Sequence, residues 1–272
     1  MRQLRLMSID ETVDYIIKNK YSCTRYGDGE FLVINGKGNS FQTDDARLAD
    51  RLVEVLNNPV DGLLVCLPSF LTDVSPFVLN SKLFGLGFNH SWLKSAVIPY
   101  VPTNILYGDS LFTRFYMNRR DKRWVKGYIP KLKKLWDGEH LLIVEGAFSR
   151  LGVGNDLFDN ALSIKRILCP NKNAFDKYDQ IYDCVCRNHK GELIILAIGM
   201  TATILSYDLC KDGYRVLDLG HIDVEYEWYK MGATEKVPIS HKQVSEIVDG
   251  FCNDQSNDSV YNQQIIADCS KI

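Results

Sequence analysis

The sequence predicts an α/β fold of the Rossmann-like type, in which a mostly parallel sheet carries helices on both faces. Strand-like apolar runs alternate with helical segments over the whole chain, the pattern of a doubly wound sheet. Residues 192–219 form the clearest unit, a strand, a glycine turn, a helix and a second strand, which predicts two parallel strands with a right-handed crossover. Hydrophobic residues make up 46% of the chain and charged residues 24%, an ordinary globular composition. In sheets of this kind, ligands bind at the carboxyl ends of the strands.

A capping box predicts the first helix. In Ser8-Ile-Asp-Glu11, the serine hydroxyl and the glutamate carboxylate can each accept a backbone N–H at the helix start. Val13, Ile16 and Ile17 then share one apolar face. The elements expected next are an apolar run with turns at 23–34, a helix that begins near residue 44 and a strand at 62–67.

The middle of the chain, residues 71–123, is rich in aromatic side chains and predicts short helices around one strand at 104–107. Beyond it, the alternation of strands and helices is clearer. The elements expected there are a basic helix at 122–136, strands at 140–144 and 163–168, a helix at 174–187, a buried strand at 192–198, a turn at 199–203 that enters a helix, and a strand at 214–219.

Length and composition bound the class of protein. With 272 residues, the chain is expected to form one large domain at 1–250, followed at 251–272 by a polar C-terminal linker or tail that could lead into a further module. A net charge of −2 without a Lys/Arg-rich run argues against nucleic acid as a partner. No apolar run follows Met1–Leu6 and none reaches about 18 residues, so we expect no signal peptide, no membrane span and a cytoplasmic location. The eight cysteines include no C-x-x-C pair and are expected to be free thiols.

Polar motifs directly after predicted strands are the main functional signal. The first reads Arg25-Tyr-Gly27-Asp28-Gly-Glu30. Asp28 and Glu30, two positions apart, could face one hard cation, which prefers oxygen ligands. Gly27 would allow close approach of a ligand, and Arg25 could pair with a phosphate. A β-hairpin is the alternative, because Asp-Gly between two apolar segments is also a hairpin turn.

The second motif follows the strand at 140–144 and contains a Gly-x-Gly turn. Its candidate nucleotide-binding residues are Arg150, Gly152, Gly154, Asn155 and Asp156. The glycines could present backbone N–H groups to a phosphate, and the arginine would add positive charge. The third glycine of the dinucleotide-binding fingerprint is replaced by leucine, so an ordinary loop is the alternative.

Two further turns follow predicted strands. In Gly199-Met-Thr201-Ala-Thr203, a glycine and two hydroxyls at a helix N-terminus suit an anion. Plain N-capping by Thr201 is the alternative. Asn173 lies in a loop after the strand at 163–168, where a simple helix start is the alternative to a role in ligand binding.

The fourth motif follows the last strand and reads Gly220-His221-Ile-Asp223-Val-Glu225-Tyr-Glu227. In an extended segment, Asp223, Glu225 and Glu227 would share one face. One of the acids could then bind an acceptor hydroxyl or serve as general base beside His221. A solvated acidic turn is the alternative.

Taken together, these motifs resemble the GT-D fold of bacterial glycosyltransferases, formerly a domain of unknown function with a D-x-E motif. The matching segments are 25–30, 150–156, 170–174, 199–203 and 220–228, within roughly residues 20–235. Met200 stands where many members have proline. The resemblance implies a Rossmann-like sheet, a UDP-sugar donor, and a divalent cation, Mn²⁺ or Mg²⁺, at Asp28 and Glu30.

The function implied by the resemblance is metal-dependent transfer of a hexose, expected to be glucose, to a glycan or glycoprotein acceptor such as the glycan of a serine-rich repeat adhesin. The expected catalytic residues are Asp28, Glu30, His221, Asp223 and Glu225. The expected nucleotide-binding residues are Arg25, Gly27, Arg150, Gly152, Gly154, Asn155, Asp156, Asn173, Thr201 and Thr203. A non-catalytic nucleotide-binding module and an NAD-dependent oxidoreductase are the alternatives. The oxidoreductase is disfavoured, because the first strand–turn–helix unit lacks the dinucleotide fingerprint.

Overall fold

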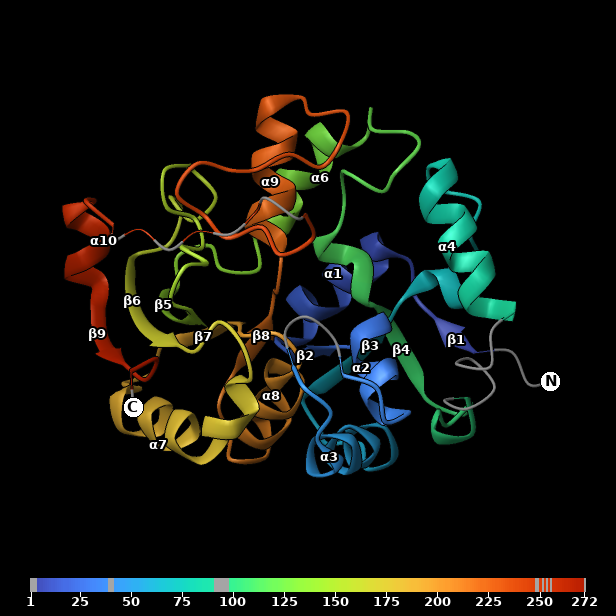
Figure 1. Ribbon diagram of the computed structural model, residues 1–272, viewed down its shortest axis with the longest axis horizontal. Helices are drawn as coiled ribbons and strands as arrows, with labels where there is room; N and C mark the ends of the chain where they lie inside the picture. The colour runs from blue at the N-terminus through green and yellow to red at the C-terminus, as the bar shows by residue number, and fades with distance from the viewer. Residues whose placement is uncertain are drawn as a thin grey trace.

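The computed structural model describes residues 4–38, 42–90, 98–247, 250, 252, 254 and 256–271. In this part of the chain, one sheet of nine strands has the order β1-β4-β3-β2-β8-β7-β5-β6-β9, and all neighbouring strands are parallel (Figure 1). The strands are β1 (Arg5–Leu6), β2 (Ser22–Arg25), β3 (Leu63–Leu67), β4 (Leu106–Asp109), β5 (His140–Gly146), β6 (Ser163–Cys169), β7 (Leu193–Ala197), β8 (Val216–Asp218) and β9 (Ile265–Asp268). The predicted α/β fold is confirmed.

Helices cover both faces of the sheet. They are α1 (Ile9–Asn19), α2 (Asp28–Ile34), α3 (Ala46–Asn57), α4 (Leu79–His90), α6 (Val125–Lys133), α7 (Tyr178–Asn188), α8 (Thr201–Lys211), α9 (Ile222–Met231) and α10 (Ser259–Gln264), with 3-10 turns η1 (Ser69–Leu71), η2 (Ile98–Tyr100), η3 (Ser110–Thr113) and η4 (Ala174–Lys177). In Figure 1, α1, α6 and α9 lie above the sheet, and α3, α7 and α8 lie below it. No described helix is long and apolar enough to span a membrane.

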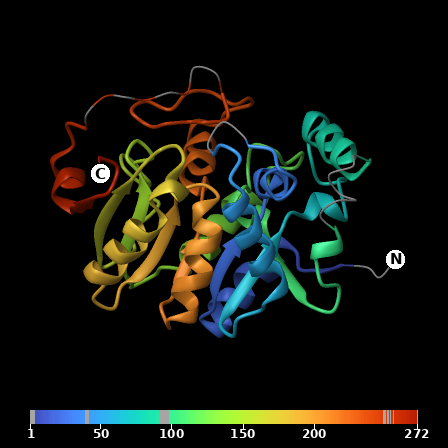
Figure 2. The same cartoon turned by 60° about the horizontal axis from the view of Figure 1, so that its bottom comes forward.

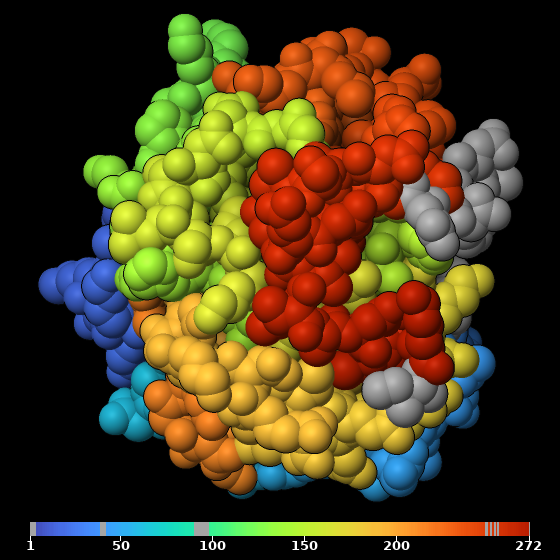
Figure 3. All heavy atoms as spheres, turned by 90° about the vertical axis from the view of Figure 1, so that its left-hand side faces the viewer, coloured from blue at the N-terminus to red at the C-terminus, as the bar shows by residue number. Residues whose placement is uncertain are grey.

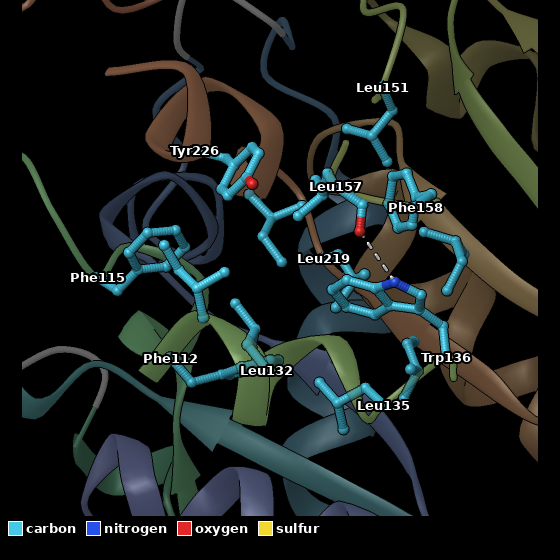
Figure 4. Packing of buried hydrophobic residues seen from close by; sticks show 14 of the residues in the cluster. Phe112, Phe115, Leu132, Leu135, Trp136, Leu151, Leu157, Phe158, Leu219 and Tyr226 are labelled. Atoms are coloured by element: carbon cyan, nitrogen blue, oxygen red, sulfur yellow. Dashed lines mark hydrogen bonds between the residues drawn. The ribbon is translucent and has the colours of Figure 1, made fainter. Parts of the chain in front are cut away.

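The core on the upper face is built around Trp136, which is fully buried (Figure 4). Its indole Nε1 donates a hydrogen bond to the carbonyl oxygen of Leu157 over 3.2 Å, and its ring centroid lies 5.0 Å from that of Phe158. The loop after β5 is therefore anchored to the chain that follows α6. Buried tryptophan contributes both apolar area and a satisfied polar group at such a junction.

The sheet reverses its winding between β2 and β8, which are neighbours through the pair Cys23 and Leu217. The β2 strand leads into α2, whose Phe31 packs in the lower core. The β8 strand leads into α9, whose Ile222 packs in the upper core. Two adjacent strands whose following helices lie on opposite faces leave a crevice at their carboxyl ends, which is where ligands bind in open α/β sheets.

The expected extended segment after β8 is wrong, because Ile222–Met231 is the helix α9. Along a helix, Asp223 and Glu227 share a face as an i, i+4 pair, whereas Glu225 points elsewhere. The physical reason is burial on nearly every side: α9 buries its apolar and acidic residues alike, so no apolar stripe of helical period shows in the sequence. Gly232, with φ of +64°, ends the helix.

The C-terminal residues were expected to be a linker or tail, yet part of them completes the sheet. Ile265–Asp268 forms β9, which pairs with β6 at its outer edge. Figure 3 shows these residues, in red, lying across that side of the molecule. Ahead of β9, Tyr261 is buried over the guanidinium of Arg166, at 5.0 Å from the ring centroid. A four-residue strand with a register shift is too short to stand out in a sequence pattern.

Three local predictions concern helix starts. The capping box at Ser8 and Glu11 is confirmed. The hairpin alternative for the first motif is wrong, because α2 begins at Asp28 and Gly27 is its N-cap. N-capping by Thr201 is also wrong: the N-cap of α8 is Met200, and no side chain caps it.

Candidate active site

A cavity of about 800 Å³ opens at the carboxyl ends of the strands. Its walls come from the residues that follow β2 to β8 and from the segment after α9, which we call the strap (residues 233–247). Figure 2 shows the strap, in orange-red, crossing this end of the sheet, with α4 at the opposite rim from α10. The volume is in the range of pockets that enclose a small molecule or cofactor.

Arg25, at the end of β2, is tied to the end of β8. Its Nη2 lies 3.1 Å from Asp218 Oδ1, its Nε donates to the Asp218 carbonyl oxygen over 2.9 Å, and its Nη1 donates to Thr113 Oγ1 over 2.9 Å. Burial raises the pKa of Asp218, and the charge of Arg25 opposes that rise. Gly220 has φ of +46°, and a Cβ there would lie 1.8 Å from Arg25 Nη2, so only glycine fits. Arg25 lines the cavity, with its guanidinium engaged by the protein itself.

Asp28 and Glu30 both line the cavity from the first turn of α2. On a helix they are separated by about 200° around the axis, so they do not share a face in the way that an extended segment would allow. Glu30 folds back, and its Oε2 accepts the backbone N–H of Gly27 over 2.7 Å. Burial raises the pKa of Glu30 to about 7, and the negative charges of Asp218 and Asp28 act in the same direction.

His221 lies at the start of α9 beside a charged pair that the sequence did not indicate. Its Nδ1 lies 3.0 Å from Glu246 Oε1 and 3.3 Å from Arg114 Nη2, and Arg114 and Glu246 form an ion pair with each other. Burial lowers the pKa of His221, and the positive charge of Arg114 lowers it further. The imidazole is therefore held neutral at neutral pH. Lys236 Nζ also approaches Glu246, at 2.5 Å from Oε2.

Asp223 lines the cavity and belongs to a buried charge cluster. Lys242 Nζ lies 2.7 Å from Asp223 Oδ2 and 2.8 Å from Glu227 Oε1. The Nδ2 amide of Asn155 donates to Asp223 Oδ1 and to Glu227 Oε1, over 2.7 Å in each case. Burial raises the pKa of Asp223, while Lys242 opposes that rise. Lys242 comes from the strap and had no sequence signal, because it belongs to no motif.

Glu225 lies outside the cavity, although the sequence placed it among the catalytic candidates. Its Oε2 accepts the backbone N–H groups of Tyr116 and Met117 over 2.8 and 2.9 Å. These bonds fix the loop that carries Arg114. The α9 helix thus directs Asp223 to the cavity and Glu225 to the scaffold behind it.

The Gly-x-Gly loop after β5 also turns away from the cavity. Arg150 is buried, and its Nη1 donates to the carbonyl oxygen of His241 over 2.6 Å and lies 3.5 Å from Asp254 Oδ1. Gly152 and Gly154 have φ of +73° and +78°, and neither lines the cavity. Asp156 binds Tyr226 and Lys230 of α9. With Asn155, this loop supports α9 and the strap, so no residue from Gly152 to Asp156 is placed to cradle a phosphate.

Of the two remaining turns, the one at 199–203 lines the cavity through other residues than expected, whereas the other lines it through the expected Asn173. Thr203 donates its hydroxyl to the carbonyl oxygen of Arg25 over 3.0 Å, and both Thr201 and Thr203 are buried away from the cavity. Gly199 and Met200, just before them, do line it. Asn173 lines it too, has φ of +52°, and accepts the backbone N–H of Thr43 through Oδ1 over 2.9 Å.

The described lining residues carry more negative than positive charge. The carboxylates are Asp28, Glu30, Asp218, Asp223 and Glu246, and the permanently charged cations are Arg25, Arg114 and Lys236. Each of these cations already contacts a carboxylate. No group of three His, Cys, Asp or Glu side chains suited to a metal ion occurs among the described residues. An anionic ligand in this cavity therefore needs additional positive charge.

Two curated proteins are similar to this chain over nearly its whole length. Over 99% of its length, the chain is 39% identical to a probable glycosyl transferase, Gly, of Streptococcus gordonii, and it covers 39% of that protein. Over 97% of its length, it is 40% identical to the glycosyltransferase GlyD of Streptococcus pneumoniae serotype 4, and it covers 32% of that protein. The chain thus spans about two fifths of the first of these curated relatives and about one third of the second.

Solved structures match over nearly the whole chain. A chain described as a new glycosyltransferase from Streptococcus sanguinis superposes with a TM-score of 0.91 at 39% identity, covering 98% of this chain and 100% of that one. A second, described as domain of unknown function 1792 with a distinct glycosyltransferase fold, gives 0.89 at 40% identity, covering 98% of this chain and 96% of that one. The family model described as Glycosyltransferase GT-D fold matches residues 23–247. The chain belongs to the glycosyltransferase GT-D fold family.

Proposed function

We propose that this chain transfers a hexose, expected to be glucose, from a UDP-sugar to a hydroxyl of a glycan or glycoprotein, such as the glycan of a serine-rich repeat adhesin. The observation that supports this most strongly is the position of Asp28 and Glu30 in a cavity at the crevice between β2 and β8. That is the ligand-binding place of an open α/β sheet.

We propose Asp28 and Glu30 as the residues that hold a divalent cation, Mn²⁺ or Mg²⁺. The excess of carboxylates among the lining residues fits this role, because a nucleoside diphosphate would otherwise be repelled. Both ions prefer oxygen ligands and keep several waters, so two side chains suffice when phosphate oxygens complete the shell. When bound, the cation would offset the negative charge that develops on the leaving diphosphate.

The protein's own groups would orient the two substrates. Gly199, which follows β7, lines the cavity and leaves open space where a side chain would lie, and α8 directs its N-terminus to the same side. Such a helix end favours phosphate. Arg114 and Lys236 both contact Glu246, and in the complex they would contact the diphosphate instead.

The proposed general base is Asp223, with His221 as the second candidate. Both line the cavity. Lys242 and Asn155 fix the Asp223 carboxylate in place, and burial raises its pKa, which makes it a better proton acceptor than an exposed aspartate. For His221, the lowered pKa keeps the ring neutral and able to accept a proton.

Thermal unfolding with UDP, GDP, ADP and NAD, each with and without Mn²⁺, tests the donor. UDP at about 100 times its Kd stabilises by about 2.7 kcal/mol, or roughly 5–10 °C in Tm. We expect that shift only with UDP and Mn²⁺ together. An equal shift with ADP or GDP would contradict the uridine preference, and a shift with NAD would favour the oxidoreductase alternative. Metal-dependent hydrolysis of UDP-glucose separates an enzyme from a non-catalytic binding module.

A further inference from the structure

We propose that an aromatic wall beside α4 is the acceptor subsite and takes the apolar face of a single sugar ring; this rests on the proposed function. The α4 wall consists of Phe70, Phe77, Asn80, Ser81, Phe84 and Asn118, all of which line the cavity. None of them belongs to a sequence motif discussed above. They follow β3 and β4, on one side of the carboxylates at the end of β2.

The aromatic part of the wall is preorganised. Phe70 and Phe77 are buried, and the Phe70 ring meets the Phe84 ring edge-on, with centroids 5.9 Å apart and an angle of 86° between the planes. Phe84 itself is 51% exposed. A half-exposed phenylalanine held by a buried one leaves an apolar ring surface open at the cavity. Sugars have apolar C–H faces that pack on such rings.

Amide and hydroxyl groups lie beside the rings. Ser81 Oγ donates to the amide oxygen Oδ1 of Asn118 over 3.1 Å, which leaves the Asn118 amide N–H groups as donors. Asn80 is exposed on the first turn of α4 and lines the same cavity. Neutral donors and acceptors at the edge of an aromatic surface match the hydroxyl rim of a sugar. The wall carries no charged side chain, so it is poorly suited to a diphosphate.

The position of the wall favours the acceptor over the donor nucleoside. Gly199 and the start of α8 lie on the other side of the β2–β8 crevice, where we place the nucleotide. An acceptor that is part of a longer glycan or protein must also extend into solvent. The wall does open outward, because Asn80 is exposed and Phe84 is 51% exposed. Figure 2 shows α4 at the rim of this end of the molecule.

The test compares Phe84→Ala with a matched control, Leu83→Ala, on the same exposed helix but outside the cavity. UDP release from UDP-glucose and Mn²⁺ is measured without acceptor and with p-nitrophenyl glycosides of glucose, galactose and N-acetylglucosamine. We expect Phe84→Ala to raise the KM for the stimulating glycoside about tenfold, as truncation of an aromatic anchor does. Leu83→Ala should leave that KM unchanged. Both variants should remain folded and keep the thermal shift with UDP and Mn²⁺, and Leu83→Ala should keep the wild-type acceptor-free UDP release.

Three results would overturn the assignment. The first is an unchanged glycoside KM in Phe84→Ala. The second is a loss of the UDP-dependent thermal shift in that variant, which would place the nucleoside on the α4 wall. The third is a wild-type enzyme that no glycoside of the panel stimulates. Absence of any UDP release and of any UDP-dependent shift in the wild type is a different result, because it refutes the proposed function and the acceptor subsite with it.

Discussion

Replacing Lys242 with methionine removes the only described cation that touches Asp223 and Glu227, while nearly keeping the length of the side chain. The Lys242 side chain is 4% exposed and that of Asp223 is 1% exposed, so water screens this pair little. Breaking a buried ion pair by removing one partner costs about 3–5 kcal/mol. Asn155 still donates to both carboxylates in the variant, which places the expected loss near the lower end, about 3 kcal/mol. For a domain of this size, that is a fall in Tm of roughly 6–12 °C.

The pH dependence of this loss gives the sharper test. Without Lys242, burial raises the folded-state pKa of Asp223 further above its unfolded value. The folded variant then binds a proton that the unfolded chain releases. Its free energy of unfolding is therefore larger at low pH and falls as pH rises. We expect the deficit against wild type to be smaller near pH 5 than near pH 8, as measured by urea unfolding at both values. The control is Lys230→Met, which removes an exposed pair with Asp156 and should cost under about 1 kcal/mol. A deficit that is as small as the control's, or that is independent of pH, would show that the cluster is not a buried ion pair.

The remaining predictions concern the proposed chemistry. Asp28→Asn should stay folded, because asparagine also suits the first turn of a helix, and should lose about a hundredfold in transfer rate, as when one charge contact to a transition state is removed; full activity that resists a chelator would refute the metal role. Because the pKa of Glu30 is raised to about 7, protons should compete with the cation, so the Mn²⁺-dependent thermal shift with UDP should weaken as pH falls below about 7. Glu30→Gln should remove that pH dependence, and a wild-type shift that is constant down to about pH 5 would contradict it. Asp223→Asn should lower the rate of sugar transfer, measured in single-turnover assays, with little change in UDP binding. If that rate stays at the wild-type value, the base is His221, and His221→Gln becomes the variant to measure.

Much of the fold could be predicted because buried parallel strands appear as continuous apolar runs. The β7–α8–β8 unit is the clearest case, with Leu193–Ala197 followed by a glycine turn and a helix that Gly213 ends. The helix α9 could not be predicted in the same way, because it is packed on nearly all sides and its apolar and acidic residues alternate. A hydrophobic period of helical spacing appears in a sequence when one face of the helix is buried, whereas α9 is buried on several faces.

The candidate site shows a similar division. Arg25, Asp28, Glu30, His221 and Asp223 could be predicted to meet, because they follow adjacent parallel strands. Their partners could not. Lys242 and Glu246 come from the irregular strap, and Arg114 comes from the loop after β4, so no period or motif marks them. Arg150 is the opposite case. It was predicted to bind the nucleotide because it follows a strand, but a charged residue at that place can equally hold a loop in position, as Arg150 does.

Both outer strands of the sheet lie outside the segment that the family model matches. A recombinant fragment trimmed to residues 23–247 would lose β1, β9 and all of α1, including the fully buried Val13 and Ile16. The edges of β4 and β6 would then present unpaired N–H and C=O groups, which template pairing with other chains. We therefore expect such a fragment to associate edge to edge and to be recovered as aggregate, although every motif of the cavity would still be present. The segment that the family model matches is therefore smaller than the unit that folds.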